Sequence, residues 1–255
     1  MEFESSLTQA VLLKRHKRFL AEIVVNNQEH RIVYCPNIGA MLGCDILGSR
    51  VWFSHSSNPG RKFPDTWELV EVDGGHLVSV NTQNTLPLVQ EAIKNGVIKE
   101  LAAFDKITAQ SFLEEHVYDL FLEKTTAVEG QREKCLVNIQ SVTLGDEIQR
   151  GFFPDAPSEK AILQLKGLIR ARSEGIRAIL FYCVQHTHIE RVFPADHIDP
   201  EFGVLLRQAF IAGVEIIAYG IEISMTTLHL HKPLEVCIPA RMIGGGSRPA
   251  KSPKA

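Results

Sequence analysis

Cationic side chains are most concentrated near the start of the chain. Lys14, Arg15, Lys17 and Arg18 flank a histidine, and Phe19 follows them. Such a cluster binds phosphates by releasing their counterions, and an adjacent aromatic ring can stack on a base. If the segment is a strand, Arg15 and Lys17 share one face and Lys14 and Arg18 the other. The alternative is a solvated strand edge that is charged to prevent aggregation, and composition alone favours it.

A second candidate for phosphate contact is the pair Arg61 and Lys62, which precedes Trp67. Loops of this kind bind oligonucleotides in OB-folds. The alternative is a surface turn beside a core tryptophan, and the two interpretations are evenly balanced.

Two pairs of histidines have the spacing of residues that chelate a metal from one face of a strand. They are His186 with His188 and His229 with His231. No cysteine or carboxylate is placed in sequence to complete a tetrahedral site. We therefore predict surface histidines and no metal site.

Composition indicates in which cell compartment the protein works and which classes of partner it favours. The net charge of −3 gives no global support to a nucleic-acid partner. The five cysteines include no CxxC pair, which indicates reduced thiols and a cytoplasmic protein. The apolar runs are too short to span a membrane, and the acidic N-terminus is unlike a signal peptide. The oligomeric state stays open.

The first eighty residues predict short strands separated by turns. Residues 21–25 and 31–35 flank a polar turn, and residues 67–72 and 76–80 flank an Asp-Gly-Gly turn, so both pairs are expected to be hairpins. With a further strand at 51–53, they indicate a small barrel. A helix is predicted over 86–95, with Gly96 ending it.

The second half alternates strands and helices. Residues 117–122 and 135–142 are expected to be paired strands, followed by a helix over 158–172 that Ser158 caps. The remaining elements are a strand at 177–184, a helix that Asp199 and Pro200 open, and a strand at 214–219. This order predicts parallel pairing. The expected parts are a barrel domain at 1–83, an α/β domain at 84–240 and a disordered tail at 241–255.

Several strings, in order along the chain, resemble the bacterial sugar fermentation stimulation protein A family. They are KRHKRFLA (14–21), CPNIGAM (35–41), RKFPDTWEL (61–69), VNT (80–82), SVTL (141–144), FPDA (153–156) and FPADHID (193–199). The resemblance covers roughly residues 1–224. It implies an OB-like barrel joined to a restriction-endonuclease-like α/β domain with a mixed sheet, α+β overall. It also implies DNA binding, duplex or single-stranded, and favours DNA contact for the basic cluster.

The same resemblance implies where a nuclease site would lie. Such a site needs an acid on one strand and an acid-x-lysine pair on the next, because carboxylates hold Mg²⁺ and the lysine stabilises developing charge. Asp119 stands in the first position. Where the family has Glu-Val-Lys-Ser, this chain has Asn138, Ile139, Gln140 and Ser141. We therefore expect vestigial positions at Asp119, Asn138 and Gln140, with no catalytic residue and no cofactor.

These inferences predict a regulatory DNA-binding protein whose nuclease-type site is inactivated. Asp119 has two equally weighted interpretations, a vestigial ligand or an acid that accepts hydrogen bonds from neighbouring strand amides. One alternative function is a Mg²⁺- or Mn²⁺-dependent nuclease with a rearranged site, completed by acids nearby in sequence: Glu114, Glu115, Asp146, Glu147 or Glu159. Another alternative is a protein-interaction scaffold that binds no nucleic acid.

Overall fold

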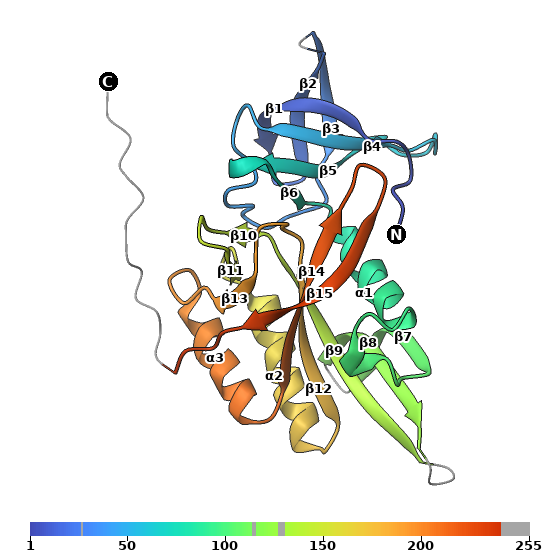
Figure 1. Cartoon of the computed structure of the whole chain (residues 1–255), viewed down its shortest axis with the longest axis vertical. Helices are drawn as coiled ribbons and strands as arrows, with labels where there is room; N and C mark the ends of the chain where they lie inside the picture. The colour runs from blue at the N-terminus through green and yellow to red at the C-terminus, as the bar shows by residue number, and fades with distance from the viewer. Residues whose placement is uncertain (27, 114–115, 127–130, 241–255) are drawn as a thin grey trace.

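The computed structural model describes residues 1–26, 28–113, 116–126 and 131–240. The molecule has two parts, a barrel formed by the N-terminal strands and a larger sheet with helices on both faces (Figure 1). The tail expected to be disordered, residues 241–255, lies outside the described residues.

The barrel is built from short antiparallel strands, as the turn pattern predicts. Its sheet has the order β3-β2-β1-β4-β5-β6, and a parallel pairing of Tyr34 with Thr66 joins β3 to β5 and closes the first five strands. Both predicted hairpins, β2–β3 and β5–β6, are confirmed. Inward side chains such as Leu12, Ile23 and Trp67 are fully buried. The strands are β1 (Thr8–His16), β2 (Leu20–Val25), β3 (Glu29–Tyr34), β4 (Arg50–His55), β5 (Asp65–Val72) and β6 (His76–Ser79).

The second part is a mixed sheet of nine strands in the order β10-β11-β13-β15-β14-β12-β9-β8-β7. Its centre is parallel, because β12 pairs in parallel with both β9 and β14, while β8 and β9 form the expected antiparallel pair. The strands are β7 (Lys106–Leu113), β8 (His116–Thr125), β9 (Arg132–Val142), β10 (Leu144–Gly145), β11 (Arg150–Phe153), β12 (Arg177–Val184), β13 (Arg191–Pro194), β14 (Glu215–Ile223) and β15 (Leu228–Val236).

Helices cover both faces of this sheet because its central strands are apolar on both sides. Helix α1 (Thr85–Lys94) packs against one face, through Val89, Ala92 and Ile93. Helices α2 (Glu159–Ser173) and α3 (Pro200–Ile211) pack against the other. No helix of the described segments is long and apolar enough to cross a membrane. The fold is α+β, with an OB-like barrel and a mixed α/β domain.

A single carboxylate holds the starts of both helices on the second face. Asp199 Oδ1 accepts a hydrogen bond from Phe202 N at 3.0 Å and caps α3, as predicted. Its Oδ2 accepts from Ser158 N at 3.0 Å, and Ser158 Oγ in turn accepts from Ala161 N and caps α2. The two helix starts are therefore fixed relative to each other.

The two parts are joined by backbone pairing as well as by the covalent connection. Ser79 N donates to Gln185 O at 2.9 Å, and Thr187 N donates to Leu77 O at 3.0 Å. The N-terminal residues pair beside the start of β15, through the bridge between Glu2 and Thr227. The hairpin β14–β15 extends to the barrel (Figure 1), where Ile221 and Leu228 pack with barrel residues in one apolar cluster.

Candidate nucleic-acid interface

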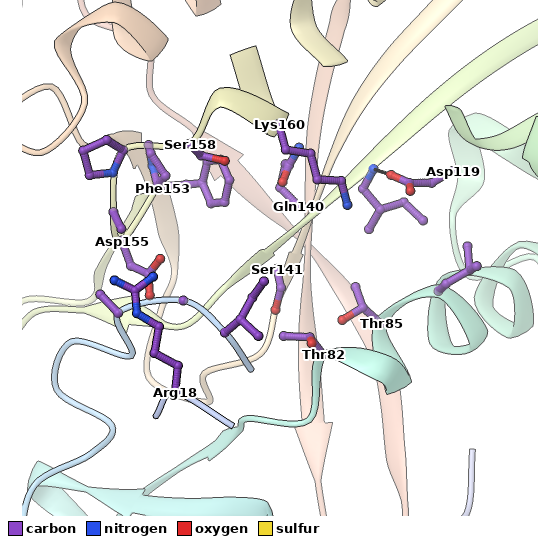
Figure 2. Close-up of a pocket in the computed structure, with 18 residues that line it drawn as sticks. Arg18, Thr82, Thr85, Asp119, Gln140, Ser141, Phe153, Asp155, Ser158 and Lys160 are labelled. Carbon is purple, nitrogen blue, oxygen red and sulfur yellow. Dashed lines mark hydrogen bonds between the residues drawn. The ribbon is translucent and has the colours of Figure 1, made fainter. Parts of the chain in front are cut away.

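A cleft of about 490 Å³ lies where the barrel meets the start of α2. Arg18 and the loop after β3 form one side. Lys160 lies on the other, near Asp119 at the start of β8 and Gln140 at the end of β9 (Figure 2). Hydroxyl groups contribute to its lining. The cleft is lined by Arg18, Ile38, Gly39, Ala40, Thr82, Thr85, Leu86, Asp119, Ile139, Gln140, Ser141, Phe153, Pro154, Asp155, Ala156, Pro157, Ser158 and Lys160.

The basic cluster does not continue as a strand. Strand β1 ends at His16, and Lys17 and Arg18 have positive φ angles of 50° and 66° in the turn to β2. The expected alternation of faces therefore fails after His16. Because the turn reorients them, Lys17, Arg18 and Phe19 are all exposed, and Arg18 reaches the cleft. Lys14, on the strand, is exposed as well.

Arg15 is turned inward, unlike the other cations of the cluster. Its side chain is only 9% exposed. Nη2 donates to the carbonyl oxygens of Asn37 at 2.6 Å, Gly39 at 2.9 Å and Arg18 at 3.0 Å, and Nη1 donates to Ala40 O at 3.3 Å. Backbone carbonyls accept from both Nη atoms, while Nε is buried without a hydrogen-bond partner among the described residues, so Arg15 makes structural contacts and its phosphate contact stays a prediction. Arg15 fixes the barrel side of the cleft.

The predicted nuclease positions lie together, bound into a network of amides. Asp119 Oδ2 accepts from Ile139 N at 2.8 Å and from Gln164 Nε2 at 3.2 Å. Asn138 Oδ1 accepts from Asp119 N at 3.2 Å and from Gln164 Nε2 at 3.3 Å. Gln140 Nε2 donates to Gln164 Oε1 at 2.8 Å. The geometry favours the second interpretation of Asp119, an acid that satisfies a strand amide.

Gln164 was not predicted as part of this group. It belongs to α2 and lies on the same helical face as Ala161, Leu165 and Leu168, all of them buried. A polar residue on an otherwise apolar helix face is the sequence signal that could have identified it.

The charge at this position is partly compensated. Burial is the largest effect on the pKa of Asp119 and raises it, while the Ile139 amide, Lys160 and Gln164 act in the opposite direction. Figure 2 shows the Lys160 side chain extending between Gln140 and Asp119, whereas Arg18 lies near Asp155 at the other end of the cleft. Asp155 Oδ2 accepts from Met41 N at 2.8 Å, so this carboxylate braces the barrel loop.

The side chains around Asp119 do not fit a hard divalent cation such as Mg²⁺ or Ca²⁺. Such an ion needs several oxygen ligands, including carboxylates. Here the amide oxygens of Asn138 and Gln164 already accept hydrogen bonds, and Lys160 brings a positive charge. Within the described segments, no group of three or more His, Cys, Asp or Glu residues could hold a metal ion.

The acids considered for a rearranged site are dispersed. Asp146 and Glu147 line a separate hollow, and Glu159, the first residue of α2, lines the hollow over β7, β8 and α2 that Asp119 also borders. Glu114 and Glu115 lie outside the described residues.

Arg61 and Lys62 do not join the cleft. Arg61 Nη2 donates to Thr66 Oγ1 at 3.1 Å, and its Nη1 lies 3.6 Å from Glu4 Oε2, in a small separate hollow. Lys62 is exposed beside it, with Nζ 5.6 Å from the centre of the Phe63 ring. The adjacent tryptophan, Trp67, is fully buried, as the surface-turn interpretation expects.

The histidines are not all on the surface. His186 is 8% exposed and lies with His76 and His188 in a hollow of about 510 Å³ between the barrel and the larger domain. The rings of His76 and His188 stack with centroids 4.0 Å apart. Burial first, then the neighbouring charges of His76 and His188, lowers the pKa of His186 to about 4. The prediction of a surface residue is therefore wrong for His186, which the domain junction buries.

Comparisons with known proteins agree with this architecture. Residues 13–80 match the SfsA N-terminal OB domain, and residues 83–227 match the sugar fermentation stimulation protein RE domain. A sugar fermentation stimulation protein homolog of Shewanella sp. (strain ANA-3) is 41% identical over 90% of this chain and 97% of its own. The homolog of Pseudomonas aeruginosa (strain LESB58) is 43% identical over 92% and 99%.

A solved structure shares the fold. It is described as the structure of Pyrococcus furiosus SfsA in complex with Ca²⁺, with a TM-score of 0.82, 24% identity, and coverage of 93% of this chain and 98% of that one. The two domain matches and the two homologs lead to the same conclusion as the shared fold. The chain belongs to the sugar fermentation stimulation protein family.

Proposed function

We propose that this member of the family is a cytoplasmic DNA-binding protein with a regulatory role, and that its nuclease-type site now serves binding instead of cleavage. The observation that carries the proposal is the cleft between barrel and α/β domain. Arg18 lies at one end of it, near Asp155, and Lys160 lies at the other, beside Asp119 and the amides that bind it.

The cleft offers groups that suit a phosphodiester backbone. Arg18 and Lys160 supply positive charge, and Ser141, Ser158 and Thr82 line the space between them. Hydroxyl and cationic side chains are the usual contacts to phosphate oxygens. Lys14 and Lys17, in the same segment as Arg18, are also exposed, and we propose that they add phosphate contacts on the barrel. Two parts of the protein would therefore contribute to binding one DNA molecule.

The amide network supports binding without cleavage. Hydrolysis by this class of enzyme needs a metal ion that activates water, and the residues around Asp119 do not fit one. The relative from Pyrococcus furiosus is described in complex with Ca²⁺, but it is too distant for its ion to be transferred to this chain. Amides at Asn138 and Gln140 also leave Asp119 as the one carboxylate of the three former nuclease positions, which lowers the repulsion of a bound phosphate.

A salt titration of DNA binding tests the proposal. Fluorescence anisotropy should show binding to labelled duplex or single-stranded DNA that weakens with salt. Lys160→Ala and Arg18→Ala should each lower the slope of log K against log salt by about 1. Lys166→Ala is the matched control, because Lys166 is exposed on the same helix outside the cleft.

Two outcomes would contradict the proposal. Absence of salt-dependent binding at low ionic strength would remove the DNA partner and leave the protein-interaction scaffold. Plasmid cleavage that requires Mg²⁺ or Mn²⁺ and is lost in Asp119→Ala would instead establish the nuclease with a rearranged site.

A further inference from the structure

A second hollow, of about 810 Å³, opens on the far side of Asp119 and Lys160. It lies over β7, β8 and α2, outside the cleft between the two domains. Asp119 and Lys160 line both hollows. The two hollows therefore adjoin at these two side chains. We call them together the trough, with Arg18 at its barrel end and Phe112 at its outer end; the carboxylates of Asp119, Asp155 and Glu159 also line it.

The outer end of this trough is apolar and exposed. Phe112 on β7 is 71% exposed, Val117 on β8 is 47% exposed, and Leu163 on α2 is 59% exposed. All three line the second hollow. Among the described strands, β7 is the last of the sheet and pairs only with β8, so this apolar surface lies at a sheet edge.

The trough combines the two features that bind an unpaired strand. Arg18 and Lys160 can follow the phosphates, and the Phe112 ring presents a face on which a base can stack. In duplex DNA each base face is already stacked on its neighbours and is not available to the ring. The midpoint holds one carboxylate, Asp119, with amides at Gln140 and Gln164, and Lys160 lies beside it, so it repels a phosphodiester less than a pair of carboxylates would.

We infer that the trough holds a single DNA strand, with its phosphates along Arg18 and Lys160 and one base stacked on Phe112. This inference rests on the proposed function and specifies its ligand. The apolar end gives affinity that does not depend on salt, and the cleft gives the part that does.

The experiment compares labelled oligothymidylate with a labelled duplex of matched length, using the full chain. Phe112→Ala should weaken binding to oligothymidylate about 5- to 100-fold, the range expected for loss of one stacked base, and leave duplex binding unchanged. Phe112→Trp should keep the affinity for the single strand, and Phe112→Leu should not. Phe210→Ala is the control, because Phe210 is 59% exposed on α3, outside both hollows.

Each remaining outcome has a distinct meaning. If Phe112→Ala has no more effect than Phe210→Ala, or if Phe112→Leu binds as the parent does, the stacking inference is overturned. The unsubstituted protein could also sediment as a dimer while Phe112→Ala sediments as a monomer with unchanged DNA binding. A second copy of the chain would then occupy the apolar end, and the inference would be wrong. If neither DNA binds the parent, the proposed function itself fails.

Discussion

At the residue scale, the informative difference is between a carboxylate and an amide of the same shape. Asn138 is fully buried, and its Oδ1 accepts hydrogen bonds from the Asp119 amide and from Gln164. A neutral oxygen satisfies these donors without the desolvation penalty of a second charge beside Asp119. The network is therefore stable because it is neutral at Asn138, Gln140 and Gln164.

Restoring a carboxylate tests that statement. Asn138→Asp should lower the free energy of unfolding by about 3–5 kcal/mol at pH 8, because it buries a charge without a counterion. Burial and Asp119 should raise the pKa of the new acid, so the folded state binds its proton more tightly than the unfolded state. Stability should then decrease as pH rises from about 4, the pKa of an Asp in the unfolded chain, through the raised pKa in the folded state. Urea unfolding of Asn138→Asp at pH 5 and pH 8 measures the free energy of unfolding at the two pH values.

Asn138→Ser is the control that removes the amide without adding charge, and it should show little of this pH dependence. Millimolar Mn²⁺ should recover part of the lost stability in Asn138→Asp, since an ion bound only by the folded state stabilises it, and should leave the parent unchanged. Equal stability of the parent and Asn138→Asp at pH 8 would contradict the burial argument.

At the scale of elements, the starts of the helices could be predicted from sequence, but the directions in which the side chains of the basic cluster point could not. Ser158 and Asp199 with Pro200 mark the starts of α2 and α3 because capping is local chemistry. Arg15 turns inward because of carbonyls some twenty residues further along the chain. Gln164 reaches Gln140 only when α2 packs on β9. A polar residue on an apolar helix face signals that Gln164 needs a partner, but the identity of a partner in a distant segment has no local signal.

The shared carboxylate at the helix starts gives a prediction at this scale. Asp199→Ala removes the cap of α3 and the acceptor for Ser158 N, so the free energy of unfolding should fall by about 2–4 kcal/mol. Ser158→Ala removes one cap and should cost only about 1 kcal/mol. Guanidinium unfolding followed by circular dichroism measures both. Equal losses would show that the contact between the two helix starts contributes nothing.

At the scale of the whole molecule, the junction between barrel and α/β domain should respond to pH. His186 is buried there, and its pKa falls from the ordinary 6.5 to about 4. Between these pH values the unfolded chain binds a proton that the folded protein does not. This contribution to stability is therefore present above about pH 6.5 and is lost as pH falls toward 4. The shift corresponds to at most about 3 kcal/mol.

Other ionisable groups line the same hollow, namely His76, His188, Asp73, Asp146 and Glu147, so variants must isolate His186. His186→Asn keeps an acceptor for His188 N and removes the titration. The variant should lose much of the dependence of stability on pH between 4 and 6.5. His231→Asn, at an exposed position of β15, should keep it. An unchanged pH profile in His186→Asn would assign the effect to another group.

The pairing of Leu77 and Ser79 with residues 185–187, together with the bridge from Glu2 to Thr227, ties the two parts together at two separate places. We therefore expect the cleft between the two parts to have its shape already in the free protein. The residues that line the cleft lose their conformational entropy during folding, so DNA binding does not have to offset that loss again. For the proposed function, we expect the DNA and not the protein to change shape on binding.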